Sequence, residues 1–366
     1  MAGIADSIAR LSRAQAGAAP QSTRLAPLED FGTNSGGLVG HWFVPDTMAD
    51  PGPLVVVLHG CTQTAAGYDH GAGWSALAQR HGFALLYPEQ TRRNNPNLCF
   101  NWFNPEDIRR DSGEALSIRQ MIGAMVARHP IDPARIYVTG LSAGGAMTSV
   151  MLATYPELFA GGAIIAGLPY GSATGVPQAL ERMRGHSTAD EAVLARAVRE
   201  ASAHQGPWPA VSVWHGAADT TVNPDNADAV VAQWRSLHGL PGAPSRSDVV
   251  AGHQHRAWTD SAGRAAVEEY RIAGMGHGVP LATSGEEPCG NAGAYMLEAG
   301  LSSTRLIARS WGLGGEASAG VDSSRPAPDA IRDEPVTDTS GAAVAGSLPN
   351  VTRIINDALK AAGLMR

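Results

Sequence analysis

The chain has 366 residues, of which 44% are hydrophobic and 17% are charged, so it can bury a large core; we expect one large α/β domain with extensions. A formal net charge of -7 gives no reason to expect nucleic acid or an anionic membrane as a partner. No apolar stretch of the sequence approaches the ~20 residues that a membrane-spanning helix needs, so we expect a soluble protein.

Residues 1–34 are expected to form an N-terminal extension. In it, Ile4, Ile8 and Leu11 share one face of a predicted short amphipathic helix. The segment lacks the continuous apolar core of a secretion signal, so we expect a cytoplasmic location. The chain has only 3 cysteines, which fits a reducing compartment, whereas a disulfide would favour a periplasmic or secreted protein.

The next elements alternate between strands and helices. The apolar runs predict strand 54–58, helix 74–81, strand 83–87, helix 110–128, strand 135–139, helix 146–155 and strand 162–166. Such an alternation is typical of an α/β fold. It predicts a mainly parallel, doubly wound sheet with helices on both faces.

The most informative motif is Gly140-Leu141-Ser142-Ala143-Gly144, which lies between a predicted strand and a predicted helix. In an α/β-hydrolase fold this arrangement places the serine on a tight strand-to-helix turn, with Oγ exposed at the carboxyl end of the strand. The flanking glycines remove side chains that would clash. The motif alone is also compatible with an ordinary turn, but its flanks favour a nucleophilic Ser142.

A serine nucleophile also needs an oxyanion hole. One donor should be the backbone N–H of the residue after the nucleophile, which is Ala143, and the other should come from the loop after an earlier strand. The loop after strand 54–58 contains Cys61, and we predict that its backbone N–H is the second donor. A nucleophilic thiol at Cys61 would need its own base and would leave Ser142 without a role.

Residues 171–209 interrupt the strand and helix alternation. The segment is rich in Pro and Gly at both ends and has a helical pattern at 189–203. Because it falls between the nucleophile and the acid in the chain, we expect a lid or cleft wall. A purely structural excursion remains an equal alternative.

The predicted catalytic acid follows the next strand, 210–215. Asp219 lies in the loop beyond the carboxyl end of that strand, where an α/β hydrolase carries its acid. Asp225 and Asp228 are the rival carboxylates. Both fall at the start of the next predicted helix, where the helix dipole favours acidic side chains, so we predict Asp219 as the acid.

The predicted general base is His277, on a glycine-flanked loop after strand 266–273. A hairpin turn at 261–263 leads into that strand. His253 and His255 could suggest a metal pair, but the sequence offers no third ligand at a suitable spacing. We therefore predict neither a metal nor a cofactor.

Ser142, Asp219 and His277 follow one another in the order nucleophile, acid and base of α/β hydrolases. In such a triad a neutral imidazole takes the serine proton and returns it to the leaving alkoxide, while the carboxylate orients the ring. The sequence thus predicts a serine carboxylester hydrolase that works through an acyl-enzyme.

The end of the chain differs in composition from the predicted catalytic domain, 35–312. Residues 313–348 form a predicted linker of low hydrophobicity, and 349–366 form a predicted C-terminal helix. The helix has an apolar stripe of Val351, Ile354, Ile355, Leu359 and Leu364. That stripe should pack on the same chain, or on a second subunit to form a homodimer.

Four sequence blocks together resemble the polyhydroxybutyrate depolymerase family of esterases, which also contains feruloyl and acetylxylan esterases. They are His-Gly-Cys-Thr-Gln at 59–63, Cys-Phe-Asn-Trp-Phe at 99–103, Gly-Glu-Ala-Leu-Ser-Ile at 113–118, and the serine motif extended to 140–147. The resemblance covers roughly residues 35 to 312. It implies an α/β-hydrolase fold and cleavage of short-chain hydroxyalkanoate polyester or its oligomers.

The resemblance also implies roles near the site. In related depolymerases the cysteines matching Cys61 and Cys99 can form a disulfide beside the nucleophile, and an aromatic residue matching the Trp102 segment lines the polyester cleft. His59 and Gln63 are further candidates for contact with substrate. A feruloyl or acetylxylan esterase is the alternative function, and a noncatalytic protein that binds polyester granules is a third.

Overall fold

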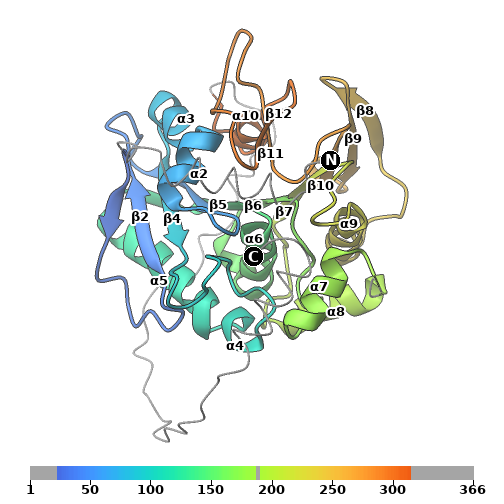
Figure 1. Ribbon diagram of the computed structural model, residues 1–366, viewed down its shortest axis with the longest axis horizontal. Coiled ribbons are helices and arrows are strands. Elements are labelled where there is room, and N and C mark those ends of the chain that lie inside the picture. The colour runs from blue at the N-terminus through green and yellow to red at the C-terminus, as the bar shows by residue number, and fades with distance from the viewer. Residues whose placement is uncertain (1–22, 187–189, 315–366) are drawn as a thin grey trace, which may run out of the picture. The chain divides into compact units, whose positions relative to one another are not determined.

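The computed structural model describes residues 23–186 and 190–314, and its core is a ten-stranded sheet with helices on both faces (Figure 1). The sheet strands are β1 (Ala26–Leu28), β2 (Val39–Phe43), β3 (Gly52–Leu58), β4 (Ala84–Glu89), β5 (Ile131–Leu141), β6 (Gly161–Ile165), β7 (Ala210–Gly216), β8 (Arg246–Val250), β9 (His253–Thr259) and β10 (Ala265–Ile272). A separate two-stranded sheet consists of β11 (Val279–Leu281) and β12 (Met296–Glu298).

The helices connect these strands. They are α2 (Ala65–Ala72), α3 (Trp74–His81), α4 (Pro105–Ile108), α5 (Gly113–Arg128), α6 (Ala143–Thr154), the short 3-10 helix η1 (Pro156–Leu158), α7 (Val176–Met183), α8 (Glu191–Glu200), α9 (Asp225–Leu237) and α10 (Ser303–Ser310). None of the helices within 23–186 and 190–314 has the length and apolarity of a membrane span. The predicted amphipathic helix near the N-terminus and the predicted helix 349–366 lie outside the described residues.

The strand order is β1-β2-β4-β3-β5-β6-β7-β10-β9-β8. From β4 to β10 neighbouring strands run parallel, and antiparallel strands complete both edges of the sheet. The predicted mainly parallel, doubly wound sheet is confirmed. β1 pairs with β2, so part of the predicted N-terminal extension is a strand of this sheet. The predicted hairpin joins β9 to β10.

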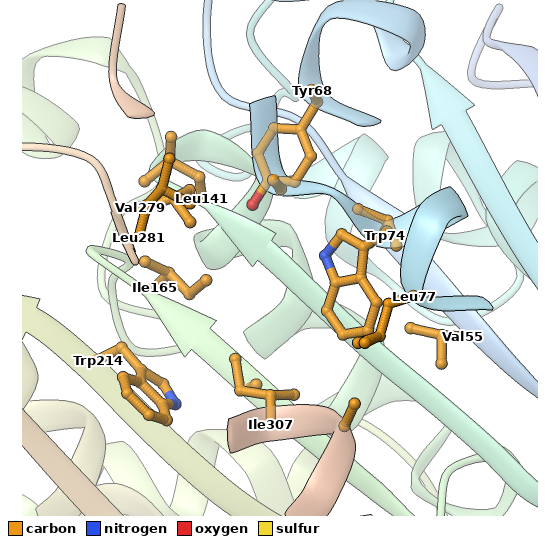
Figure 2. Close-up of a cluster of buried hydrophobic side chains, with 14 of the residues drawn as sticks. Val55, Tyr68, Trp74, Leu77, Leu141, Ile165, Trp214, Val279, Leu281 and Ile307 are labelled. Carbon is orange, nitrogen blue, oxygen red and sulfur yellow. The ribbon is translucent and has the colours of Figure 1, made fainter. Parts of the chain in front are cut away.

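Helices α5, α6 and α9 cover one face of the sheet, and α2, α3 and α10 cover the other (Figure 1). Every residue of β3 is buried, as expected for a parallel strand covered on both faces. Figure 2 shows Trp74 and Leu77 of α3 and Ile307 of α10 gathered over the central strands. Burying one such large apolar side chain contributes about 1.5–3 kcal/mol, so this cluster is a major source of stability.

Helix α5 begins at Gly113 and not at Arg110, where the apolar pattern predicted its start. The backbone explains the difference, because Asp111 and Gly113 have φ angles of 60° and 51°, outside the right-handed helical region. Within the interrupting segment, the predicted helix is α8, and Asp190 caps it by accepting a hydrogen bond from the N–H of Ala192 (2.8 Å).

Candidate active site

Ser142 lies on a sharp turn between β5 and α6. Its φ of 58° and ψ of -118° are strained for a residue with a side chain, at a cost of about 1–3 kcal/mol. Its N–H donates to the carbonyl oxygen of Ile165 (2.9 Å), which holds the turn. A Cβ on Gly140 would lie 2.4 Å from the Gly144 oxygen, and one on Gly144 would lie 2.2 Å from the Leu58 oxygen. Only glycine fits at either position.

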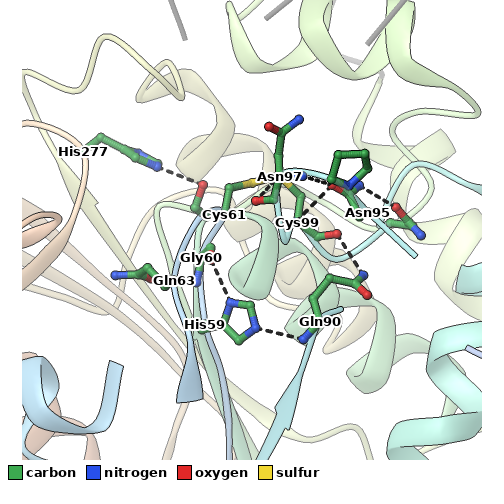
Figure 3. Close-up of a disulfide and its surroundings, with 12 residues drawn as sticks. His59, Gly60, Cys61, Gln63, Gln90, Asn95, Asn97, Cys99 and His277 are labelled. Carbon is green, nitrogen blue, oxygen red and sulfur yellow. Dashed lines mark hydrogen bonds between the residues drawn. A yellow bond between two sulfur atoms is a disulfide. The ribbon is translucent and has the colours of Figure 1, made fainter. Parts of the chain in front are cut away.

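His277 reaches the nucleophile from the loop after β10. Its Nε2 lies 2.9 Å from Ser142 Oγ, and its Nδ1 lies 2.7 Å from Oδ2 of Asp219. Figure 3 shows the His277 ring directed toward the serine turn beside the disulfide. The three residues come from loops after β5, β7 and β10, whose parallel strands end at the same edge of the sheet. The structure therefore brings the predicted triad together in one hydrogen-bonded chain.

Asp219 is buried, and its Oδ1 accepts hydrogen bonds from the N–H groups of Thr221 (2.8 Å) and Val222 (2.9 Å). Burial alone would raise the pKa of this carboxyl. The hydrogen bonds from His215 and His277, together with that from Val222, outweigh burial and hold the pKa of Asp219 well below its usual value. The acid is therefore ionised at neutral pH.

The loops that carry the acid and the base are bonded to each other. The N–H of Ala217 donates to the Ile272 oxygen and that of Ala218 donates to the Met275 oxygen, both at 2.9 Å. These bonds set the distance between Asp219 and His277 through the backbone.

The two rival carboxylates lie in the first turn of α9, as predicted. Asp228 forms ion pairs with Arg256 (3.0 Å) and Arg271 (2.6 Å) on the neighbouring strands. It supports the contact between α9 and the sheet. The N–H of Asp225 donates to the Asn223 side chain (2.9 Å) in the same turn, and it is Asp219 that contacts the His277 ring.

The two predicted oxyanion donors belong to different elements, the start of α6 and the loop after β3. Ala143 is the first residue of α6, so its N–H has no partner within the helix. In the loop after β3, the N–H of Gly60 donates to Gln63 Oε1 (2.8 Å), and the N–H of Thr62 donates to a carbonyl of the neighbouring loop (2.7 Å). Among the hydrogen bonds within the described residues, none uses the Cys61 N–H. That group is available to an oxyanion.

Cys61 and Cys99 form a disulfide, 38 residues apart in the sequence (Figure 3). The bond ties the oxyanion loop to the loop that carries Trp102. With its sulfur in a disulfide, Cys61 has no thiol to act as a nucleophile. Cys289 is a buried free cysteine.

His59 and Gln63, the further candidates for contact with substrate, both make hydrogen bonds within the loop after β3. The His59 ring is buried, with Nδ1 2.8 Å from the Gly60 oxygen and Nε2 accepting from the N–H of Gln90 (3.0 Å) (Figure 3). Burial lowers the pKa of His59, which keeps the ring neutral. Gln63 uses Oε1 to hold Gly60. Both side chains support the oxyanion loop, and His59 has no ring nitrogen left for substrate.

Trp102 belongs to a small apolar cluster beside the nucleophile. The other buried members are Ala143, Ala146, Leu168, Ala173, Ala179 and Val222. Phe103 stands edge-on to Trp102 with ring centroids 5.6 Å apart, and Met183 packs on the same cluster. Ala179 and Met183 come from α7, so the segment predicted as a lid or cleft wall contributes to the apolar surroundings of the site.

Glu114 is a buried residue whose role no sequence pattern indicates, and it contacts the loop that carries Cys99. Its carboxylate accepts from the side chains of Gln90 (2.6 Å) and Asn94 (3.0 Å) and from the N–H of Asn101 (2.8 Å). Burial and the nearby Asp107 raise its pKa, against the effect of these donors. The residue stands in one of the blocks that carry the family resemblance, but its partners could not be read from the sequence.

The two histidines considered as a metal pair have protein partners. His253 lies between the Ala273 N–H (3.2 Å) and the Ala299 oxygen (2.8 Å). His255 lies between the carboxylates of Asp248 (2.7 Å) and Glu268 (3.0 Å). Within residues 23–186 and 190–314, no three His, Cys, Asp or Glu side chains are grouped as a metal site requires.

Known proteins with similar sequences are esterases. The family model described as Esterase PHB depolymerase matches residues 40–267. Poly(3-hydroxyalkanoate) depolymerase C of Paucimonas lemoignei is 47% identical over 291 residues, which cover 79% of this chain and 70% of the relative. Feruloyl esterase B of Talaromyces funiculosus is 26% identical, over 71% of this chain and 74% of that protein.

The fold is also found in a solved esterase. The acetyl xylan esterase from Aspergillus awamori superposes with a TM-score of 0.64 and 25% identity, covering 69% of this chain and 93% of that one. The chain thus has the predicted α/β-hydrolase fold.

Proposed function

Because the chain belongs to the polyhydroxybutyrate depolymerase family of esterases, we propose that it hydrolyses short-chain hydroxyalkanoate polyester or its oligomers through a serine acyl-enzyme. One observation carries the chemistry: Ser142 Oγ lies 2.9 Å from His277 Nε2, and His277 Nδ1 lies 2.7 Å from Asp219 Oδ2. This geometry is that of a nucleophile, a general base and the acid that orients the base.

The reaction proceeds in two halves. Neutral His277 takes the proton of Ser142 Oγ as the oxygen attacks the ester carbonyl carbon, and the N–H groups of Cys61 and Ala143 stabilise the oxyanion. His277 then returns the proton to the leaving alkoxide, which departs as an alcohol. In the second half, water loses a proton to His277 and attacks the acyl-enzyme, releasing the acid and restoring Ser142.

The apolar cluster suits the acyl part of such an ester. Trp102 and Val222, from different loops, pack in one cluster with Ala143, the residue after the nucleophile, and α7 adds Ala179 and Met183. Hydroxyalkanoate esters present small alkyl groups, which an apolar cluster beside the nucleophile can contact. The relative with 47% identity is named for this substrate class, whereas the feruloyl and acetylxylan esterases are 26–29% identical.

The test is mass analysis of the products formed from a hydroxybutyrate trimer. Release of monomer and dimer by the wild type, with none from Ser142→Ala, supports the proposal. Methyl ferulate and acetylated xylose are the comparison substrates. Faster turnover of either one would assign the chain to the alternative esterase function.

A noncatalytic role is tested in the same preparation. Sedimentation with polyester granules by Ser142→Ala, without product release by the wild type from any ester, would favour a granule-binding protein. Sedimentation together with hydrolysis supports the enzyme.

Three further points are part of the proposal. Residues 35–312, together with β1, form the catalytic domain, and α7 serves as a cleft wall. The Cys61–Cys99 disulfide favours the periplasmic or secreted alternative over the cytoplasm, because such bonds persist in oxidising compartments. A homodimer through the predicted helix 349–366 rests on residues outside those described.

A further inference from the structure

His215 is a completely buried side chain near the end of β7 that the proposed reaction does not use. Its Nε2 lies 2.8 Å from the carbonyl oxygen of Val222 and 3.4 Å from Oδ2 of Asp219. Val222 in turn donates its N–H to Oδ1 of Asp219 (2.9 Å). One ring nitrogen of His215 therefore contacts both ends of the turn that carries the acid.

These contacts define the protonation of the His215 ring. A carbonyl oxygen can only accept, so Nε2 must carry a proton and donate it to Val222. Nδ1 is buried and has no hydrogen-bond partner among the described residues. A proton on Nδ1 would be a buried donor without an acceptor, which is unfavourable. The contacts favour a neutral ring with its proton on Nε2.

We infer that His215 is a positioning residue for the acid: as a neutral donor, it closes the turn from Asp219 to Val222 and holds the carboxylate toward His277. This inference rests on the proposed function, because it gives His215 a role only if Asp219 and His277 act in ester hydrolysis.

The carboxylate of Asp219 then receives three hydrogen bonds and one longer contact, from His215. Thr221 and Val222 bind Oδ1 through their N–H groups, and His277 and His215 face Oδ2. His215 Nε2, at 3.4 Å, interacts with the negative charge of Oδ2 more weakly than His277 Nδ1 does at 2.7 Å. Without His215, more of that charge acts on His277.

The consequence is a defined change in pH dependence. A carboxylate that has lost the nearby Nε2–H of His215 holds the imidazolium form of His277 more strongly. Because hydrolysis requires neutral His277, the acid limb of kcat/KM should move to higher pH. The titratable groups that face the pair are His215, Ser142 and Tyr295, whose ring centroid is 6.0 Å from that of His277.

The competing explanation is that His215 only fills space in the core. Loss of packing would then lower stability, and any loss of activity would be equal at every pH. It would leave the midpoint of the acid limb unchanged, so the pH profile separates the two explanations.

The experiment compares kcat/KM from pH 5 to 9 on a soluble hydroxybutyrate oligomer for the wild type, His215→Gln, His215→Leu and His215→Asn. The Gln amide can reach Val222, the Asn amide is too short, and Leu has no donor. His238→Leu is the matched control: it also removes a histidine Nε2 that contacts a backbone carbonyl, that of Pro209 (3.0 Å), but lies away from the triad. Melting temperatures are recorded for every variant.

We expect His215→Leu and His215→Asn to lower kcat/KM about tenfold or more and to move the acid midpoint upward by about half a pH unit or more. His215→Gln should keep the wild-type midpoint, and so should His238→Leu, even if it melts earlier. If the Leu variant does not fold, the Asn variant gives the same comparison.

Unchanged midpoints of the acid limb in both His215→Leu and His215→Asn would overturn the inference and leave His215 with a packing role. An equal shift of the acid-limb midpoint in His215→Gln and His215→Leu would also overturn the inference. The effect would then come from a charge on His215 and not from a neutral donor. A wild type without esterase activity would instead refute the proposed function, so the two failures are distinguishable.

Discussion

The site has two halves that are held by different forces. The acid–base half consists of the turn from Asp219 to Val222 and the loop of His277, and it is fixed by backbone amides and buried histidines. The proposed oxyanion half consists of residues 59–63 and 95–103, and it is fixed by the Cys61–Cys99 disulfide and by Glu114.

Because different forces hold the two halves, we expect changes in one half to affect the reaction rate and changes in the other to affect stability. Hydrogen bonds to a carboxylate decide where its charge lies and how it orients a base, so changes in the acid–base half should act mainly on rate. A disulfide restricts the unfolded chain whatever the charge nearby, so changes in the oxyanion half should act mainly on the free energy of unfolding.

The largest effect should follow from loss of a proton-transfer partner. Ser142→Ala and His277→Ala should each lower kcat on the order of a millionfold, and the double variant should lose little more, because the two residues act as one unit. Single-turnover kinetics on a hydroxybutyrate oligomer measure this. Losses that multiply in the double variant would mean that the two residues do not work together.

The next effect should come from the acid. Asp219→Asn should lower kcat about a thousandfold or more, because the amide stabilises the wrong tautomer of His277. Asp228→Asn, in α9, is the matched control and should have little effect on kcat. A larger loss of kcat in Asp228→Asn than in Asp219→Asn would mean that Asp219 is not the catalytic acid.

The same substitution has a pH signature in folding. Because the folded protein holds the pKa of Asp219 below its usual value of about 3.9, the ionised carboxylate stabilises the fold above that pH, and the stabilisation is lost as pH falls below it. The difference in free energy of unfolding between wild type and Asp219→Asn should therefore be larger at pH 6 than at pH 3. Urea unfolding at both pH values checks the sign.

Glu114 tests the oxyanion half without touching the disulfide. Glu114→Gln places amide hydrogens against the donors of Gln90 and Asn94, so it should lower the free energy of unfolding by about 1–3 kcal/mol and activity only modestly. Glu106→Gln is the control, since Glu106 is exposed and paired with Arg109 on the surface. A similar decrease in the free energy of unfolding in Glu114→Gln and Glu106→Gln would mean that Glu114 has no special structural role.

The smallest effect on activity should come from the disulfide. Reduction, or Cys61→Ser, should lower the free energy of unfolding by up to about 4 kcal/mol for a loop of 38 residues, because the unfolded chain gains freedom. Most of the activity should remain, since the backbone N–H of Cys61 is retained. A nearly complete loss of activity with an unchanged free energy of unfolding would contradict the claim that the oxyanion half acts mainly on stability.

The sequence predicted the elements that local patterns encode. Ser142, Asp219 and His277 each follow an apolar strand, and parallel strands end at one edge of a sheet, so the three could be expected to meet. The start of α5 could not be predicted, because positive φ angles at Asp111 and Gly113 leave no mark in an apolar pattern.

The supporting residues were harder to predict for a physical reason. The partner of His59 is a backbone N–H 31 positions away, and Glu114 binds groups from three other positions in a loop. His215 lies within an apolar strand pattern that hides its ring nitrogens. Contacts between distant segments depend on the folded path of the chain, which the local sequence does not encode.

In the proposed reaction, Ser142 forms the covalent intermediate under the control of His277. The direct measurement is peptide mapping by mass spectrometry after treatment with an activated phosphonate ester, which transfers its phosphonyl group to a nucleophilic serine oxygen and releases its leaving group. We predict one modification, on Ser142, that is absent in Ser142→Ala and strongly slowed in His277→Ala. Modification of another residue, or equal labelling of Ser142 with and without His277, would contradict the account.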